Sequence, residues 1–258
     1  MARFFVALMF GPLVFWPAAA PAQDMLGGVD FASPDMTAAQ MSRAEVEAAI
    51  LAAGGKPLDL TGKRLSGLDL SGLDLRGAVL RVARLNHAHL AGARLDGANL
   101  DQAWALDADF TRASLVGASL FQAQLMRSTF DEADFSNARI AANFAGASLR
   151  RAKLRGANGA ADEKNQSMGL MRATLQSAHL EGADFTGADL SRADLRYAHC
   201  ADANFADARL READASGADL RGARFAGSTT SGLDLDQADI DAQTAFPDAV
   251  HQERARRH

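Results

Sequence analysis

Large apolar residues recur every five positions along most of the chain. From Leu60 in steps of five to Ile140, 16 of 17 positions hold Leu, Phe or Ile, and the exception is Ala105. A second run in the same step extends from Leu170 to Ile240, where 12 of 15 positions are Leu, Phe or Ile. This step fits neither the helical period of about 3.6 residues nor the strand period of about two. A fixed period sustained over this length predicts a solenoid.

A small residue precedes each large one by two positions. It is Ala at every step from Ala78 to Ala123 and again from Ala173 to Ala223. Two inward side chains, two apart, fit one short extended segment, and turn formers such as Thr186-Gly187 follow the large residue. Each unit therefore predicts one straight side and one corner. Stacked coils place large residues on large and small on small, with the backbones about 4.8 Å apart.

The units ADFTG, ADLSR, ANLDQ, ASLVG and ADLRG resemble those of the pentapeptide repeat family. The resemblance covers residues 58–242. It implies an all-β solenoid, a right-handed quadrilateral β-helix with four units in each coil. On that rule the two runs make roughly nine coils, a length on the order of 40 Å.

Two interruptions break the pattern. The spacing drops to four between Ile140 and Phe144, so one corner must be tightened or one side shortened. The segment 159–169, GAADEKNQSMG, lacks the pattern and is predicted to leave one corner as a loop.

The ends of a solenoid are exposed edges that need covering. Ser42 and Glu45 match a capping box, and Val46, Ile50 and Leu51 are expected on one face of a helix over 37–53. This helix closes an N-terminal segment, 23–57. At the other end, Phe246 and the rest of the tail 243–258 are expected to fold over the last coil.

Residues 1–22 read as a signal peptide. Arg3 supplies a positive start, an apolar stretch follows, and Ala20 and Ala22 suit cleavage after Ala22. An uncleaved anchor is the alternative, but the apolar stretch is short for a spanning helix. The mature chain is expected to be periplasmic or secreted, with no stable membrane span. Cys200 is the only cysteine, so no internal disulfide can form, and its place in the repeat points it inward.

Charge and motifs exclude several function classes. The net charge is -5, with no basic excess of the kind that non-specific nucleic-acid binding favours. The sequence has no nucleophile elbow, phosphate loop or cysteine zinc pattern. We expect no catalytic residue, no cofactor and no bound metal.

Two groups of outward residues are candidate binding surfaces. An interaction patch is predicted at Trp104, Leu106, Phe121 and Met126, because outward apolar residues that cluster mark partner surfaces. Scattered apolar residues that need no explanation, and cover by the loop or by a second copy, are the alternatives. A basic patch is formed by Arg150, Arg151, Lys153 and Arg155, which would suit an anionic partner or would simply be a solvated face.

Other outward positions fall outside the repeat consensus. His179 and His199 are 20 apart and should stack, with Glu181 nearby; a metal site and solvated surface histidines are the two interpretations. Arg196, Tyr197 and His199 are the variable letters of one coil that the repeat does not explain.

These observations favour a non-enzymatic, exported scaffold that binds an unidentified protein through rigid outer faces. The resemblance also offers a DNA-mimic protein that binds gyrase, since the family includes quinolone-resistance proteins. A secreted effector is a further alternative. A dimer is compatible with the sequence. The sequence identifies neither the binding partner nor the oligomeric state.

Overall fold

The computed structural model describes residues 29–161, 171–244, 246–247 and 256–257. The chain divides into two units, Met1–Phe31 and Ala32–His258, and the fold described below is that of the second. The predicted signal peptide and its cleavage site lie outside the described residues. Within those residues, no helix is both long and apolar enough to cross a membrane.

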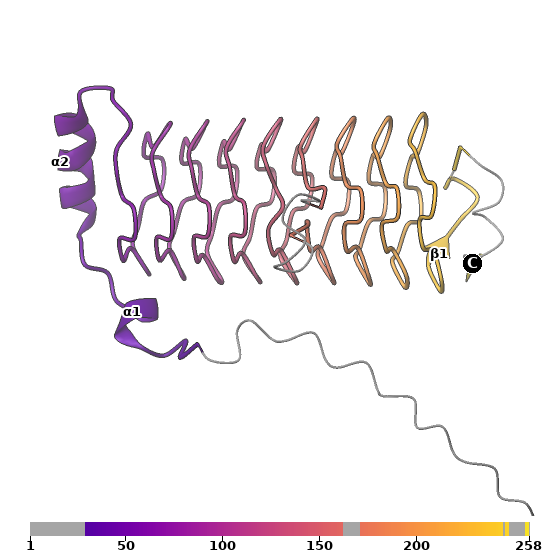
Figure 1. Cartoon of the computed structure of the whole chain (residues 1–258), viewed down its shortest axis with the longest axis horizontal. Helices are drawn as coiled ribbons and strands as arrows, with labels where there is room; N and C mark the ends of the chain where they lie inside the picture. Colours follow the sequence, from indigo (N-terminus) through magenta and orange to yellow (C-terminus); the bar gives the residue numbers. More distant parts are fainter. Residues whose placement is uncertain (1–28, 162–170, 245, 248–255, 258) are drawn as a thin grey trace, which may run out of the picture. The chain divides into compact units, whose positions relative to one another are not determined.

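The repeats wind into stacked coils (Figure 1). Residues one coil apart pair in parallel, so that Arg64 pairs with Arg84 and Arg84 with Trp104. Four such ladders run along the stack, and we name them faces A, B, C and D after their first residues, Asp59, Arg64, Asp69 and Asp74. Faces A, B and C each stack nine residues within the described coils. The right-handed quadrilateral β-helix of roughly nine coils is confirmed.

Each side of a coil is too short to form a regular strand. A side contributes one bridged residue before the chain turns, so the described strands are only β1 (Asp239–Ile240) and β2 (Arg256–Arg257). The stability of the stack comes from backbone hydrogen bonds between coils, such as Leu85 N–H to the Trp104 carbonyl at 2.6 Å. The small number of assigned strand residues follows from the length of the sides.

The core is a set of stacked columns of the predicted small and large residues. Leu65, Leu85 and Ala105 are fully buried in one column, and Cys200 is buried in another. Phe185, Phe205 and Phe225 stack in a third, with ring centroids 5.0 Å apart at each step. Burial of apolar surface contributes about 25 cal/mol per Å², so these columns supply most of the folding free energy.

The corners are tight turns that need a left-handed residue. At the first corner the Lys63 N–H donates to the Leu60 carbonyl at 3.0 Å, and Gly62, the second residue after Leu60, has φ +65°. A type II turn requires this conformation, which glycine adopts without strain. One coil later Val82 holds the same place with φ 50°.

The two interruptions keep the ladders in register. At the four-residue step, Ala142 N–H donates to the Ile140 carbonyl at 2.8 Å, and rungs such as Gln124–Asn143 are 19 residues apart. At the predicted loop, the rung from Asn143 to Thr174 spans 31 residues where an ordinary rung spans 20, which is eleven more. Residues 162–169 of that loop lie outside the described residues.

Gly159 is part of the stack, although the repeat pattern suggested that the loop begins there. Its N–H donates to the Asp189 carbonyl at 2.8 Å, and its carbonyl accepts from Ala173 N–H at 2.8 Å. At an ordinary corner the equivalent of the bond from Ala173 N–H to the Gly159 carbonyl joins residues three apart, as Lys63 N–H and the Leu60 carbonyl do. Here the bond closes around the eleven added residues. A Cβ on Gly159 would lie 2.8 Å from the Ala173 Cβ, so the neighbouring side chains fill the space of a large residue.

The N-terminal end is covered by α1 (Pro34–Thr37) and α2 (Arg43–Ala53). The capping box is confirmed: Ser42 accepts from the Glu45 N–H, and the Glu45 carboxylate accepts from the Ser42 N–H. The predicted start at residue 37 is wrong. Ser42 is extended as the cap, and the preceding Ala39 pairs antiparallel with Leu65.

Helix α2 buries a narrower face than expected. Val46 is fully buried in the core cluster and Ile50 packs against it. Leu51 is 81% exposed, so its predicted place on the same face is wrong. Residues four apart share a helix face, whereas residues five apart are turned by about 140°.

The described residues of the C-terminal tail lie over the last coil, as predicted. Phe246 stacks on Phe225 with ring centroids 4.4 Å apart, which extends the phenylalanine column. The Thr244 hydroxyl donates to the Leu220 carbonyl at 2.9 Å. Strand β2 pairs in parallel with β1, so that Arg256 lies opposite Asp239. The tail therefore adds a rung to face C.

Candidate interaction surface

The chemistry-bearing side chains of the described coils lie on the outside. The columns hold apolar residues, and Cys200 is the buried thiol among them. Burial raises the pKa of the Cys200 thiol, which keeps it protonated and unreactive. Ligand recognition in these coils therefore falls to the ladders and corners.

One hollow of about 460 Å³ lies between α2 and the first coil. Its lining includes the apolar residues Ile50, Leu58 and Leu75 and the charged residues Lys56, Asp74 and Arg76. The Arg76 guanidinium donates to both oxygens of Asp74, at 2.7 and 2.6 Å. The carboxylate of Asp74 is thus already engaged, and these two residues do not present a free acid–base pair to the hollow.

The predicted apolar patch is mostly withdrawn from solvent. Leu106 is 5% exposed, whereas Trp104, Phe121 and Met126 are partly buried. The Arg139 guanidinium covers the Phe121 ring at 3.7 Å from its centroid, a cation–π contact. Trp104 lies on face B, and the other three lie at the corners on either side of it. The structure brings the four residues together around one face, with little apolar area left open.

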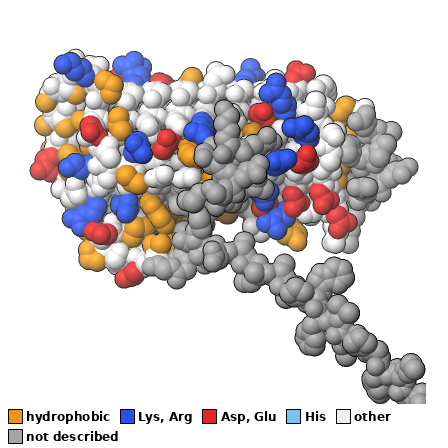
Figure 2. Space-filling view, in the orientation of Figure 1, with side chains coloured by type: hydrophobic (Ala, Val, Ile, Leu, Met, Phe, Trp, Pro, Cys, Tyr) orange, Lys and Arg blue, Asp and Glu red, His pale blue; other side chains and the backbone are white. Residues whose placement is uncertain are grey.

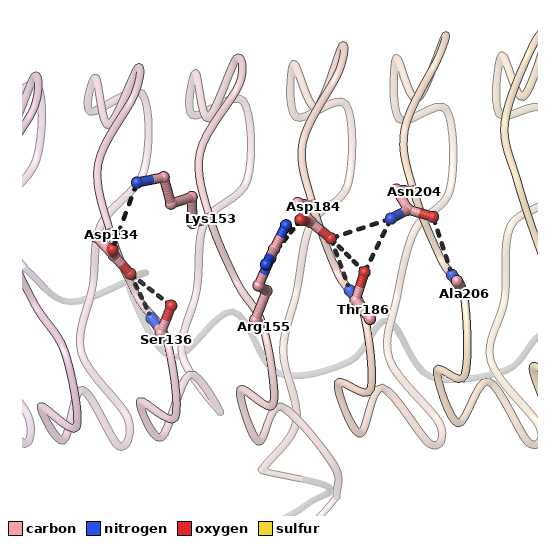
Figure 3. A network of polar contacts seen from close by, with 8 residues as sticks. All are labelled: Asp134, Ser136, Lys153, Arg155, Asp184, Thr186, Asn204 and Ala206. Atoms are coloured by element: carbon pink, nitrogen blue, oxygen red, sulfur yellow. Dashed lines mark hydrogen bonds and ion pairs between the residues drawn. The ribbon is translucent and has the colours of Figure 1, made fainter.

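The predicted basic patch lies on one coil, around face D, between two acidic coils. Toward the preceding coil, Arg151 pairs with Glu132 at 2.8 Å and Lys153 lies 3.8 Å from Asp134. Toward the following coil, Arg150 pairs with Glu181 at 3.5 Å and Arg155 with Asp184 at 2.5 Å. Figure 3 shows the part of this network on face D, where Asp184 also contacts Thr186 and Asn204. Each base therefore has an acidic neighbour that offsets its charge. Whether the patch binds an anionic partner stays a prediction.

Figure 2 shows the same mixing on a larger scale, with acidic and basic side chains interspersed over the visible face of the coils. Residues 171–244 contain 13 Asp and Glu and 7 Arg, a net charge of -6. Much of this acid is paired. Both oxygens of Asp219 accept from Arg221, at 2.8 and 2.6 Å, and Asp189 lies 3.3 Å from Arg209.

His179 and His199 are neighbouring rungs of face C, as predicted. Their rings are parallel within 9°, with centroids 4.6 Å apart. Nδ1 of His179 lies 3.4 Å from a carboxylate oxygen of Glu181, and the other oxygen of Glu181 lies 3.5 Å from Nε of Arg150. Within the described ranges, no group of three or more His, Cys, Asp or Glu is arranged to hold a metal ion.

Tyr197 stands out at the corner between faces B and C. It is 59% exposed and holds the left-handed corner position with φ 57°. A Cβ on Gly217, one coil further, would lie 2.5 Å from both Cδ1 and Cε1 of Tyr197, so this edge of the ring lies against that glycine. Aromatic rings of this kind, rigid and partly exposed, are frequent anchors in protein interfaces.

Arg196 and Asp194 fix the base of this corner. The Arg196 guanidinium donates to both oxygens of Asp194, at 2.9 and 2.7 Å, and approaches Asp214 at 3.6 Å. Asp194 is 3% exposed. Burial alone would raise the pKa of Asp194, but the hydrogen bonds from Arg196 and the nearby charge of Arg172 hold it below the usual value. Asp194 is therefore charged at neutral pH and holds Arg196 in one geometry.

The sequence matches the family profile of pentapeptide repeats in eight copies, over residues 64–103, 107–140, 140–158, 170–199 and 203–240. These segments make up more than half of the chain. The chain belongs to the pentapeptide repeat family. No curated protein matches the sequence significantly.

Several solved pentapeptide repeat proteins are similar to this one. HetL of Nostoc sp. strain PCC 7120, involved in heterocyst differentiation, is 26% identical over 77% of this chain and 96% of its own, with a TM-score of 0.26. QnrB1, a plasmid-mediated fluoroquinolone resistance protein, is 16% identical over 74% of this chain and 91% of its own, with a TM-score of 0.39. A protein of the Arabidopsis thaliana thylakoid lumen is 22% identical over 73% of each chain, with a TM-score of 0.17. These likenesses bear on the fold alone.

In a pentapeptide repeat protein the consensus letters build the coil, so recognition must come from the remaining ones. The structure adds Val116 and Leu51 to Tyr197 as exposed large apolar residues of the described coils and cap. The sequence gives a signal for Tyr197, a large residue at a corner position that glycine usually holds. It gives none for Val116, whose exposure depends on its neighbours along the D–A corner.

Proposed function

We propose that this pentapeptide repeat protein is a non-enzymatic scaffold, exported from the cell interior, that binds a protein partner through its outer surface. The observation that carries the proposal is the filled core. Packed apolar side chains occupy every large position of the column that holds Leu65, Leu85 and Ala105, so the coils offer their exterior as the binding surface. The predicted signal peptide supports export.

The corner around Tyr197 is the surface that fits best. Its ring is exposed and lies with one edge against Gly217, and Arg196 beside it is held by two aspartates. A preorganised surface loses little conformational entropy on binding, which favours affinity. The predicted patch at Trp104 is less favourable, since its apolar area is partly covered.

The charge pattern argues against the DNA-mimic alternative. The net charge of -6 over residues 171–244 corresponds to about one charge per 3 Å of stack, against about one per 1.7 Å in duplex DNA. Ion pairs such as Asp219–Arg221 and Asp189–Arg209 reduce the local field further. A gyrase supercoiling assay with the mature protein is expected to show no change in activity.

Photocrosslinking tests the surface. A photoreactive phenylalanine analogue replaces Tyr197 in one variant and Arg112 in another, an exposed corner residue with a similar φ of 56°. A discrete crosslinked protein from position 197 is expected in the cells that make the chain, with little from position 112. Excess unlabelled wild type should compete the crosslink away, and Tyr197→Ala should compete poorly. Equal capture from both positions, or equal competition by Tyr197→Ala, contradicts the proposal.

Export is tested separately by mass spectrometry of the protein recovered from those cells. A mature chain that starts at Gln23 is expected. Recovery of the intact N-terminus from the cytoplasmic fraction contradicts export and leaves the binding surface unaffected.

A further inference from the structure

The imidazoles of His179 and His199 form a pair of adjacent ligands on a rigid frame. The two residues are bridged rungs of face C, held by the Leu180 N–H to His199 carbonyl bond at 2.7 Å. Their rings stack at 4.6 Å, and both are accessible: His179 is 38% exposed at its side chain and His199 is exposed. The backbone spacing thus sets the separation of the rings.

Glu181 orients the first of the two rings. Its Oε1 lies 3.4 Å from Nδ1 of His179 and accepts from Nη2 of Arg150 at 3.5 Å, and Oε2 lies 3.5 Å from Nε of Arg150. A proton on Nδ1 shared with Glu181 leaves the lone pair on Nε2, at the far side of the ring. A carboxylate behind an imidazole is the usual outer partner of a metal-binding histidine, and it makes the ring a better donor.

The side chains on the neighbouring rungs of face C are engaged in other hydrogen bonds. Ser148, on the rung before His179, accepts from Arg150 at 2.7 Å. Asp219, on the rung after His199, is occupied on both oxygens by Arg221. The two imidazoles are therefore the side chains on this part of face C whose Nε2 lone pairs are available to a metal ion.

We propose that His179 and His199 bind one divalent late transition-metal ion, with Cu(II) bound most tightly. Imidazole nitrogen suits Cu(II), Ni(II) and Zn(II), and Cu(II) leads this series for a given ligand set. Metal–nitrogen bonds of about 2.0–2.1 Å at a near-tetrahedral or square angle bring two nitrogens to roughly 3 Å apart. The ring centroids are 4.6 Å apart with the rings parallel, so metal binding requires the exposed rings to tilt their Nε2 edges toward each other. Water completes the coordination, because no third protein ligand is arranged there in the described residues.

Copper titration of three proteins tests the site. His199→Phe keeps a flat ring stacked on His179 and removes one ligand. His89→Phe makes the same change on the same face, where His89 pairs with Asp69 and Asp109 and has no stacked imidazole. Far-UV circular dichroism checks that all three are folded.

Wild type is expected to bind one equivalent of Cu(II). His199→Phe should bind it at least about tenfold more weakly, because removing a direct ligand costs more affinity than removing an outer hydrogen-bond partner, which already costs about tenfold or more. Copper should also raise the melting temperature of wild type and of His89→Phe, and should do so much less for His199→Phe. Electron paramagnetic resonance of the copper complex should show two imidazole nitrogens in wild type. Unchanged affinity in His199→Phe, or an equal loss in His89→Phe, overturns the proposal.

Discussion

Val82 shows what a corner demands of a single residue. Its φ of 50° is uncommon for any side chain and strained for a β-branched one. Seventeen non-glycine residues of the described chain have positive φ. Glycines at the equivalent corners adopt the same conformation without this strain. The repeat tolerates the strain because the inter-coil hydrogen bonds and the columns on either side fix the backbone.

Val82→Gly is therefore expected to stabilise the protein. Relief of left-handed strain, roughly 1–2 kcal/mol, exceeds the added entropy of the unfolded glycine, roughly 0.5–1 kcal/mol. The net gain in the free energy of unfolding, of about 0.5–1 kcal/mol, is measured by urea denaturation. Arg81→Gly, at the adjacent exposed corner residue without positive φ, should instead lower the free energy of unfolding. A loss in both variants contradicts the strain argument.

The contribution of Asp194 to stability depends on pH. Its pKa is lower when folded than when unfolded, so its contribution to stability is present above the unfolded value, about 3.9, and disappears as the pH falls through the folded value. Asp194→Asn should destabilise the protein at pH 7 by about 1–3 kcal/mol, the range for hydrogen bonds to charged groups. The gap between variant and wild type should narrow as the pH falls below the unfolded value. A gap that is constant from pH 7 to pH 2 contradicts a charge-based role.

At the scale of elements, α2 closes the N-terminal end with one buried residue. Val46 is fully buried on the first coil, and Leu51 on the same helix faces outward. The cap thus joins the solenoid core through Val46 and Ile50, and the capping box fixes where the helix begins.

Val46→Ala is expected to lower the free energy of unfolding by about 1–3 kcal/mol, because it removes two buried methyl groups and leaves a cavity. Leu51→Ala should change it by less than about 0.5 kcal/mol, as an exposed substitution. Thermal or urea unfolding of the two variants compares them directly. Similar losses would mean that Leu51 has a packing partner.

The sequence predicted much of this because the repeat links each letter to a place in the coil. The columns, the capping box and the inward position of Cys200 follow from spacing alone. The start of α2 did not, since Ala39 pairs with Leu65 across more than twenty residues, and such pairing overrides local propensity. Cover of Phe121 by Arg139 was not predictable either, because it depends on side-chain reach between coils.

At the scale of the whole stack, the coils keep register across the interruption at Gly159. The bond from Ala173 N–H to the Gly159 carbonyl closes the corner as if the eleven added residues were absent. Deleting 162–172 leaves residues 160 and 161 between Gly159 and Ala173, the ordinary corner length.

This deletion is expected to shift the melting temperature by no more than a few degrees, since it restores the standard unit and shortens a loop at small entropic gain. It also removes Arg172, which lies 3.6 Å from Asp194, but the two hydrogen bonds from Arg196 to Asp194 remain. Deleting ten residues, 162–171, leaves one extra residue at the corner and should lower the melting temperature much more. Equal melting temperatures for the two deletions contradict the register argument.

The Gly159–Ala173 junction has a use that follows from its geometry. The hydrogen bond there holds the two ends of the inserted segment at the distance of an ordinary turn, while the columns on both sides stay continuous. A foreign peptide grafted between residues 161 and 173 would be displayed as a loop on a rigid support, and its length would not be transmitted to the coils that follow.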